Sequence, residues 1–337
     1  MKIFDLFISV LYLGTTAFGT PAKGARANTV SRTTPPSGCL SVGSSGTYST
    51  ISAALTALGS GTYAEQIKID YAGSLIIYGE TTDSGLYKDN TVTITNTISS
   101  EEAGSLDLSA TVNIVSDGVS LYNINVVNGY GKGAQAFSGY QDTLYAKSGT
   151  QYYSNCLIEG AVDYIFGDAS AWFGECDIVS NGSGSITANS REESTDSSWY
   201  AIDHCNIKAA SGVSLDGEVY LGRPWRVLAR VIYQNSVLGD LINAAGWTTM
   251  ATGATPLYYE YDNTGDGSST SDRLYETSIS AGVTKTTVLG SGYGDWIDER
   301  EKSEILDLSI RAQSIREKQE KNKKKRPREG SNFQPPD

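Results

Sequence analysis

Two aspartates with closely similar surroundings are the residues of this sequence best suited to chemistry. Asp142 lies in GYQDTLY (139–145) and Asp163 in GAVDYIFG (160–167), among aromatic and apolar residues. They are 21 residues apart, and if that step is one coil of a solenoid, their carboxyl groups lie about 5 Å apart. Two carboxylates so placed repel by about 3 kcal/mol at an effective dielectric of about 20, which separates their pKa values. One should keep its proton near neutral pH while the other is ionised, which pairs an acid with a nucleophile.

The pair by itself leaves the reaction open. The same spacing suits a retaining glycosidase, and a single aspartate often only shapes a turn. A conventional serine esterase is disfavoured because the sequence has no Gly-x-Ser-x-Gly elbow. The only histidine, His204, lies in a strand-like frame, where we expect a structural role. A metal site is disfavoured too, because there is no histidine pair and no Cys-x-x-Cys.

A repeated frame around three cysteines predicts the elements that position these acids. Cys156, Cys176 and Cys205 occur in SNCLIEG, GECDIVS and DHCNIKA, at steps of 20 and 29 residues. Recurrence at this period is typical of stacked repeats. Only 19% of the residues are charged and Tyr, Gly, Ser and Thr are abundant, which favours strands and turns over helices. Similar strand patterns occupy 74–81, 90–97, 119–129 and 229–238.

These patterns predict an all-β chain folded as a right-handed parallel β-helix, a single-stranded solenoid. The alternative is a β-sandwich, whose meandering strands would not bring the three cysteine frames into register. A helix is expected at 49–58, closing one end of the solenoid. A long polar loop is expected at 260–273.

The two ends of the chain differ from its middle. Residues 1–19 have the layout of a secretory signal peptide, with cleavage after Gly19 or as late as Ala27. The β-helix domain is expected at 38–299, followed by a basic tail at 300–337 that is helical or disordered. No later segment has the roughly 20 apolar residues of a membrane helix. We therefore expect a secreted, extracellular monomer.

Charge and cysteine content narrow the possible partners. The net charge of the chain is −12. Residues 300–337 carry 11 basic and 7 acidic residues, a charge of +4, so residues 1–299 carry −16. An acidic body disfavours nucleic acid as a partner, and a polyanionic ligand would need a less acidic surface. The four cysteines could form disulfides in any of three pairings.

Together with LGRPW (221–225), GTYAEQ (61–66) and AGW (245–247), the two aspartate motifs resemble those of the pectin methylesterase, or pectinesterase, family in its microbial short form. The resemblance implies a parallel β-helix that hydrolyses the methyl esters of polygalacturonate, or pectin, to methanol and pectate. It implies no cofactor, and neither nucleic acid nor membrane as a partner.

The resemblance also assigns roles to individual residues. Asp163 would be the nucleophile that forms an acyl-enzyme, and Asp142 the general acid and base. Gln141 would stabilise the oxyanion, and Arg223 would keep Asp163 ionised. The residues expected to contact substrate are Gln135, Tyr140, Phe166 and Trp225.

The sequence departs from the family pattern in two places. Only seven residues separate Gln135 from Asp142, too few for the coil that the family has there. A strand is also missing before GTYAEQ. Lost strands remove interfaces between coils and can expose a sheet edge, so we expect lower stability than in relatives and a loss of activity as one outcome. A polysaccharide lyase or glycosidase on a similar solenoid, and an inactive carbohydrate-binding relative, therefore remain alternatives.

Overall fold

The structure is a computed structural model that describes residues 47–48, 67–70, 72–79, 81, 87–90, 92–96, 103–128 and 142–297. It also gives the backbone of two strands near the N-terminus, β1 (Ile8–Tyr12) and β2 (Leu40–Val42). The chain divides into two units, residues 1–297 and 298–337, and the second lies outside the described residues. The expected helix at 49–58, the GTYAEQ motif and the basic tail also lie outside them.

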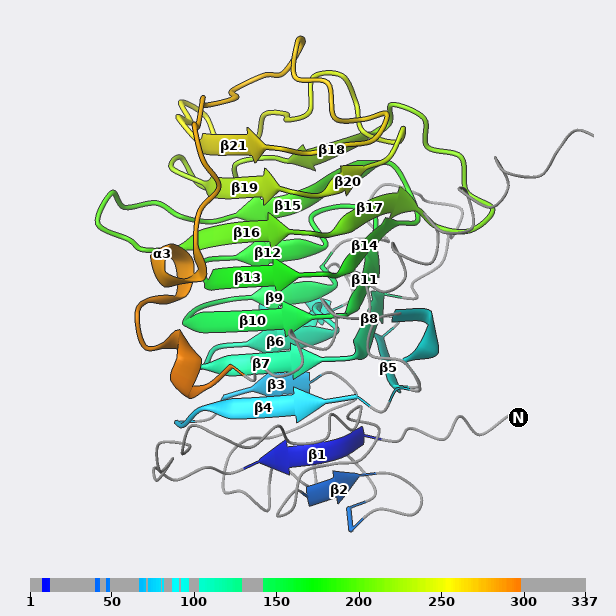
Figure 1. Ribbon diagram of the computed structural model, residues 1–337, viewed down its shortest axis with the longest axis vertical. Helices are drawn as coiled ribbons and strands as arrows, with labels where there is room; N and C mark the ends of the chain where they lie inside the picture. The colour runs from blue at the N-terminus through cyan, green and yellow to red at the C-terminus, as the bar shows by residue number, and fades with distance from the viewer. Residues whose placement is uncertain are drawn as a thin grey trace, which may run out of the picture. The chain divides into compact units, whose positions relative to one another are not determined.

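The first unit is built from three sheets whose strands stack along one axis (Figure 1). The first sheet contains β1 and β2, followed by β4 (Leu75–Tyr78), β7 (Val119–Tyr122), β10 (Thr150–Ser154), β13 (Ser170–Gly174), β16 (Trp199–Asp203), β19 (Arg230–Gln234) and β21 (Leu257–Tyr261). The second contains β5 (Val92–Asn96), β8 (Ile124–Asn128), β11 (Leu157–Gly160), β14 (Asp177–Ser180), β17 (Asn206–Ala209) and β20 (Val237–Leu238). The third contains β3 (Ile67–Ile69), β6 (Val112–Ile114), β9 (Leu144–Ala146), β12 (Ile165–Gly167), β15 (Gly184–Asn189) and β18 (Val219–Gly222).

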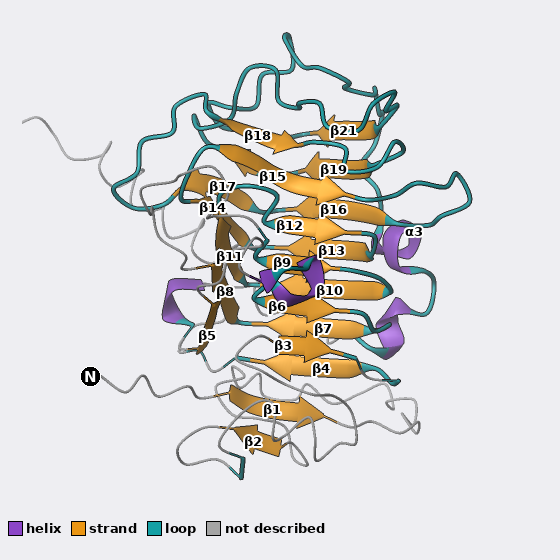
Figure 2. Ribbon diagram, turned by 180° about the vertical axis from the view of Figure 1, so that it is seen from behind, coloured by secondary structure: helices purple, strands orange, loops and turns teal. Residues whose placement is uncertain are grey.

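Each coil contributes one strand to each sheet, and the next coil lays its strands beside them. From β3 to β21 the pairings within the sheets are parallel, for example β9 with β12 and β12 with β15 (Figure 2). The fold is therefore the predicted right-handed parallel β-helix, and the β-sandwich alternative is wrong. β1 falls inside the predicted signal peptide and pairs antiparallel with β4, so cleavage after Gly19 would remove it.

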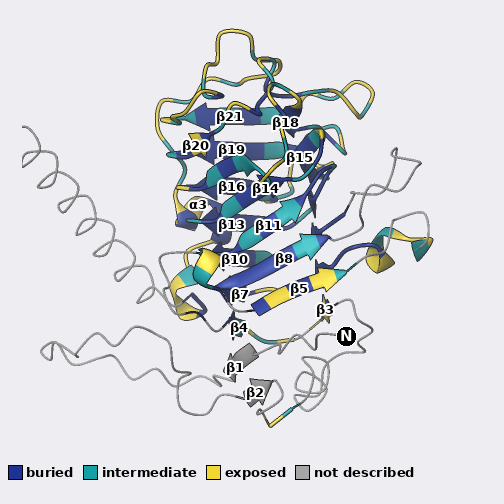
Figure 3. Ribbon diagram, turned by 90° about the vertical axis from the view of Figure 1, so that its right-hand side faces the viewer, coloured by how far each residue is buried: buried dark blue, intermediate teal, exposed yellow. Residues whose placement is uncertain are grey.

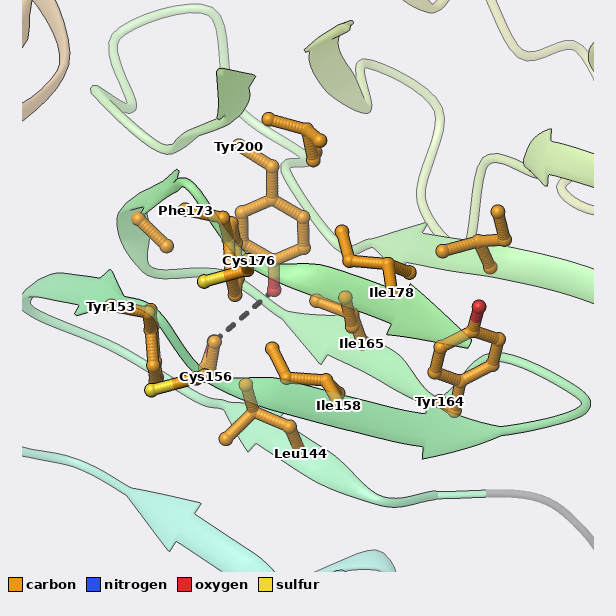
Figure 4. Close-up of a cluster of buried hydrophobic side chains, with 14 of the residues drawn as sticks. Leu144, Tyr153, Cys156, Ile158, Tyr164, Ile165, Phe173, Cys176, Ile178 and Tyr200 are labelled. Carbon is orange, nitrogen blue, oxygen red and sulfur yellow. Dashed lines mark hydrogen bonds between the residues drawn. The ribbon is translucent and has the colours of Figure 1, made fainter. Parts of the chain in front are cut away.

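The cysteine frames mark the register of the second sheet. Leu157 pairs with Asp177, and Asp177 with Asn206, so the cysteine before each of them occupies the same place on three successive coils. Cys156, Cys176 and Cys205 are free thiols and are buried. Figure 4 shows Cys156 and Cys176 in the core near Ile158 and Ile178. Cys39, the fourth cysteine, lies outside the described residues. No disulfide therefore joins the three cysteines that the sequence pattern singled out.

Residues with left-handed backbone lie one or two positions before five strands of the second sheet, β8, β11, β14, β17 and β20. The residues involved have φ between 49° and 57° and are Asn123, Asn155, Glu175, His204 and Asn235. Asparagine tolerates this conformation better than most residues, and the Asn155 Nδ2 donates to the Asn123 Oδ1 on the neighbouring coil at 2.9 Å. His204 belongs to this series and its Nδ1 lies 3.0 Å from the Asp203 Oδ1, which fits its expected structural role.

One face of the first sheet is covered by the end of the described chain. Val288 and Leu289 of helix α3 (Lys285–Leu289), and Trp296, which directly follows the 3₁₀ turn η3 (Tyr293–Asp295), form a cluster with Tyr152 and Trp172. Strands are mostly buried, while the loops beyond β21 are largely exposed (Figure 3). The polar loop predicted at 260–273 begins only after β21, because Glu260 is a buried residue of that strand.

The expected exposed edge before Asp142 is not present in the described coils. β9 pairs with β6 on one side and β12 on the other. In the same coil β10 pairs with β7 and β13, and β11 with β8 and β14. The ladders can close here because each coil presents the same three strands. No sheet edge is therefore exposed at β9 in the part of the chain that the structure describes, and the lower stability stays a prediction.

Candidate active site

Asp142 and Asp163 occupy equivalent places on neighbouring coils. Each lies two residues before a strand of the third sheet, and Leu144 of β9 pairs with Ile165 of β12. The φ angles of the two aspartates are 71° and 49°, so both sit in left-handed turns. Each is almost fully buried, with exposed fractions of 1% and 2%. The predicted one-coil step between the acids is confirmed by this register, which puts equivalent positions about 4.8 Å apart.

Arg223 reaches Asp163 from the coil beyond the intervening strand β15. It follows β18 directly, and its backbone N–H donates to the Thr187 carbonyl oxygen at 3.0 Å. The guanidinium donates from Nε to the Asp163 Oδ1 at 2.9 Å and from Nη2 to Oδ2 at 2.6 Å. This two-point contact is the strong geometry for an arginine and a carboxylate. The predicted pairing of these two residues is present.

The electrostatic environment separates the two acids. The pKa of Asp142 is raised to about 7, mainly by burial; the hydrogen bond from Ser109 opposes this rise and the charge of Asp163 adds to it. Burial also raises the pKa of Asp163, but the hydrogen bonds and charge of Arg223 oppose that rise. The same pair raises the pKa of Arg223, which stays protonated. Of the two acids, only Asp163 faces a guanidinium within the described residues, and that contact favours its ionised form.

Ser109 is a site residue that the sequence patterns did not reveal. It follows the 3₁₀ turn η2 (Leu106–Leu108), and its Oγ donates to the Asp142 Oδ2 at 2.8 Å. The two residues are 33 positions apart, and they meet only because β6 lies beside β9. Nothing in the local sequence around Ser109 marks it, so only the register of the coils could have identified it.

An aromatic cluster lies beside the acids on the third sheet. Leu144 and Ile165 face the main core, whereas the alternate residues Tyr145 and Phe166 form a second cluster. Their rings stack at 4.3 Å, and Trp225 lies 6.1 Å from the Phe166 ring. Phe166 is only 2% exposed, whereas Trp225 is partly exposed. Of the two predicted substrate contacts that the structure describes, Trp225 therefore has more accessible surface. Gln135, Tyr140 and Gln141 lie outside the described residues.

Gly222 sets how closely Arg223 can approach. A Cβ on Gly222 would lie 2.1 Å from the Thr187 Oγ1 and 3.2 Å from the Trp247 ring. We expect Gly222→Ala to push β18 away from β15 and move the guanidinium, lowering kcat/KM by about 100-fold. Gly294→Ala is the matched control, because a Cβ there meets no atom within 4 Å. Equal kcat/KM values for the two variants would contradict this account.

The described residues were also compared with the requirements of a metal site and of a membrane-spanning helix. Among them, no group of three or more His, Cys, Asp or Glu side chains is arranged to hold a metal ion. Nor does that part of the chain contain a helix both long and apolar enough to cross a membrane.

Comparison with known proteins gives a consistent result. The family profile described as Pectinesterase matches residues 132–298. A protein named "Probable pectinesterase A" of Aspergillus niger is 70% identical over 313 residues, covering 85% of this chain and 95% of that protein. "Pectinesterase A" of Emericella nidulans is 67% identical over 294 residues, covering 79% and 90%.

Solved structures agree with the sequence relatives. The crystal structure of the pectin methylesterase from Aspergillus niger in deglycosylated form has a TM-score of 0.70 at 72% identity, covering 79% of this chain and 98% of that one. Pectin methylesterase from carrot has a TM-score of 0.56 at 25% identity, covering 76% and 93%. With these identities over most of both chains, the protein belongs to the pectinesterase family.

Proposed function

We propose that the chain is a carboxylic ester hydrolase that converts methylated polygalacturonate, or pectin, to pectate and methanol through an aspartyl acyl-enzyme. One observation carries the mechanism: two buried acids on neighbouring coils, of which only Asp163 is paired with a guanidinium within the described residues. That arrangement supplies a nucleophile and a proton donor at the same pH.

The first half-reaction forms the acyl-enzyme. The Asp163 carboxylate attacks the ester carbonyl carbon, and negative charge develops on the carbonyl oxygen. As the C–O bond to the methoxy group breaks, Asp142 gives its proton to the departing oxygen and methanol leaves. The galacturonyl group is then held on Asp163 as an anhydride, and Asp142 is a carboxylate.

The second half-reaction restores the enzyme. Asp142 takes a proton from water, which attacks the galacturonyl carbonyl carbon. The bond to Asp163 breaks, releasing the galacturonate carboxylic acid and returning Asp163 as a carboxylate. Arg223 favours each state in which Asp163 is negatively charged. By resemblance, Gln141 would donate to the oxyanion, and Gln135, Tyr140 and Trp225 would hold the polymer.

The remaining proposals concern place and assembly. We infer secretion from the N-terminal pattern of residues 1–19, and from the polymer substrate, which lies outside cells. We propose that the protein acts as a monomer on pectin, without nucleic acid or membrane. The β-helix domain would then span residues 38–299, with 300–337 as a separate basic tail.

Methanol release from highly methylated pectin by the purified protein tests the proposed function. We expect one methanol for each carboxyl group freed, with no new reducing ends and no unsaturated products. New reducing ends would indicate a glycosidase, and unsaturated ends a lyase. Pectin binding without any of these products would indicate an inactive binding relative.

A further inference from the structure

We propose that Ser109 is a positioning residue that directs the transferable proton of Asp142 onto its Oδ1. The inference rests on the proposed esterase function only for its effect on rate. The hydrogen-bond geometry stands without it.

The Ser109 hydroxyl has two acceptors but a single hydrogen. Its Oγ lies 2.8 Å from the Asp142 Oδ2 and 3.1 Å from the Leu106 carbonyl oxygen. A hydroxyl donates one hydrogen at a time and can accept through its lone pairs. Since Ser109 is 0% exposed and Asp142 1% exposed, water cannot readily take over this contact.

The backbone holds the hydroxyl in this place. The Ser109 N–H donates to the Leu106 carbonyl oxygen at 3.3 Å, which ends the turn η2. Three residues later, the Val112 N–H donates to the Thr143 carbonyl oxygen at 3.1 Å, in the residue next to Asp142. Both partners are therefore anchored on paired coils, and the contact does not depend on a mobile side chain.

This contact distinguishes the two oxygens of Asp142. When Oδ2 accepts from Ser109, a proton added to the carboxylate goes to Oδ1, and Ser109 keeps its hydrogen bond. A proton on Oδ2 would force the hydroxyl to turn toward Leu106 or to accept instead. Because a hydrogen bond to a charged oxygen is stronger than one to a neutral oxygen, the same contact also favours the carboxylate.

The distinction between the two oxygens of Asp142 applies both when Asp142 gives its proton and when it takes one back. Oδ1 gives the proton to the departing methoxy oxygen and later takes one from water, while Ser109 stays on Oδ2. Ser109 exchanges no proton with substrate, which is why it is a positioning residue.

The test compares Ser109→Ala with wild type by two independent readouts. The first is the titration of the Asp142 carboxyl carbon, followed by ¹³C NMR of aspartate-labelled protein and assigned with an Asp142→Asn variant. Loss of the hydrogen bond should raise the pKa of Asp142, so its midpoint moves to higher pH. The second is the pH profile of methanol release. Its alkaline limb should move the same way, and kcat should fall about 10- to 100-fold.

Further variants separate positioning from general damage. Ser109→Thr keeps the hydroxyl and should restore the titration midpoint, and Ser109→Cys, a weaker donor, should lie between. Ser236→Ala removes another buried hydroxyl, bonded to the Gln234 and Ile202 carbonyl oxygens, and should leave the Asp142 midpoint unchanged. If Ser109→Ala does not fold, the midpoint of Ser109→Cys decides the question.

An unchanged midpoint and alkaline limb in Ser109→Ala, or in Ser109→Cys if it must substitute, would overturn the proposal, even with a lowered melting temperature. If wild type releases no methanol, the proposed function fails, but the NMR titration still tests the contact. The two failures are therefore distinguishable.

Discussion

Asp163→Asn should lower the rate of methanol release by about 10⁴- to 10⁶-fold, the scale seen when a covalent nucleophile is removed. The amide is nearly the same size as the carboxylate, but it cannot form the acyl-enzyme. Folding should be little affected, because Arg223 is partly exposed and water can replace its lost partner. The measurements are methanol release at substrate saturation and thermal melting of the same preparation.

Asp177→Asn is the matched control for this experiment. Asp177 is also an aspartate with a cationic partner, Lys208, but it belongs to β14 in the second sheet. The same chemical change should leave turnover near the wild-type value. If Asp163→Asn retained turnover, or both variants lost it equally, Asp163 would not be the nucleophile. Pectin affinity retained by Asp163→Asn, with turnover lost, would separate binding from catalysis.

Arg273→Met should lower the free energy of unfolding by about 3–5 kcal/mol near pH 8, because it leaves the buried carboxylate of Glu260 without its charged partner. Arg273 and Glu260 side chains are 1% and 2% exposed, with Nε 2.8 Å from Oε1. The guanidinium also donates to three backbone carbonyl oxygens, those of Asn243, Ala244 and Gly267. The Trp247 Nε1 donates to the same Glu260 at 3.1 Å. One arginine thus ties three segments at this end of the solenoid.

The loss should depend on pH in a definite direction. Burial raises the pKa of Glu260, and Arg273 opposes this rise. In Arg273→Met the pKa of Glu260 should therefore be higher than in wild type. The folded variant then binds more protons than the unfolded chain, and its stability falls as pH rises. Denaturant unfolding at pH 4.5 and pH 8 should therefore give the larger difference from wild type at pH 8.

Two controls accompany this comparison. Arg273→Met combined with Glu260→Gln removes both charges and should recover part of the loss. Lys68→Met breaks the exposed pair with Asp70 and should cost less than about 1 kcal/mol. An equal loss at both pH values would mean that Arg273 stabilises only through its backbone contacts.

The period of the solenoid could be predicted because it leaves a local signature. The residues before each cysteine adopt left-handed turns, and the apolar residues after it alternate along a strand. The step between Cys156 and Cys176 matches the step between the two aspartates, so the relation of Asp142 to Asp163 followed from spacing. Arg223 was identified only through its motif, since nothing local ties it to Asp163.

Contacts between distant coils could not be predicted in the same way. Ser109 meets Asp142, and Arg273 meets Glu260 and Gly267, through pairings that depend on how many residues each turn contains. Turn length varies freely on a surface, so the sequence pattern alone does not specify these neighbours. The expected gap before Asp142 illustrates the point, because the ladder closes across it with β6 beside β9.

Because β6 lies beside β9, the order of the coils determines which side chain contacts Asp142. Adding one complete coil between Asn128 and Asp142 would insert a new strand between β6 and β9. Ser109 would then be separated from the acid by a full layer, although neither residue had changed. Gain or loss of a coil would therefore change the pKa of a buried acid without substituting any residue of the site.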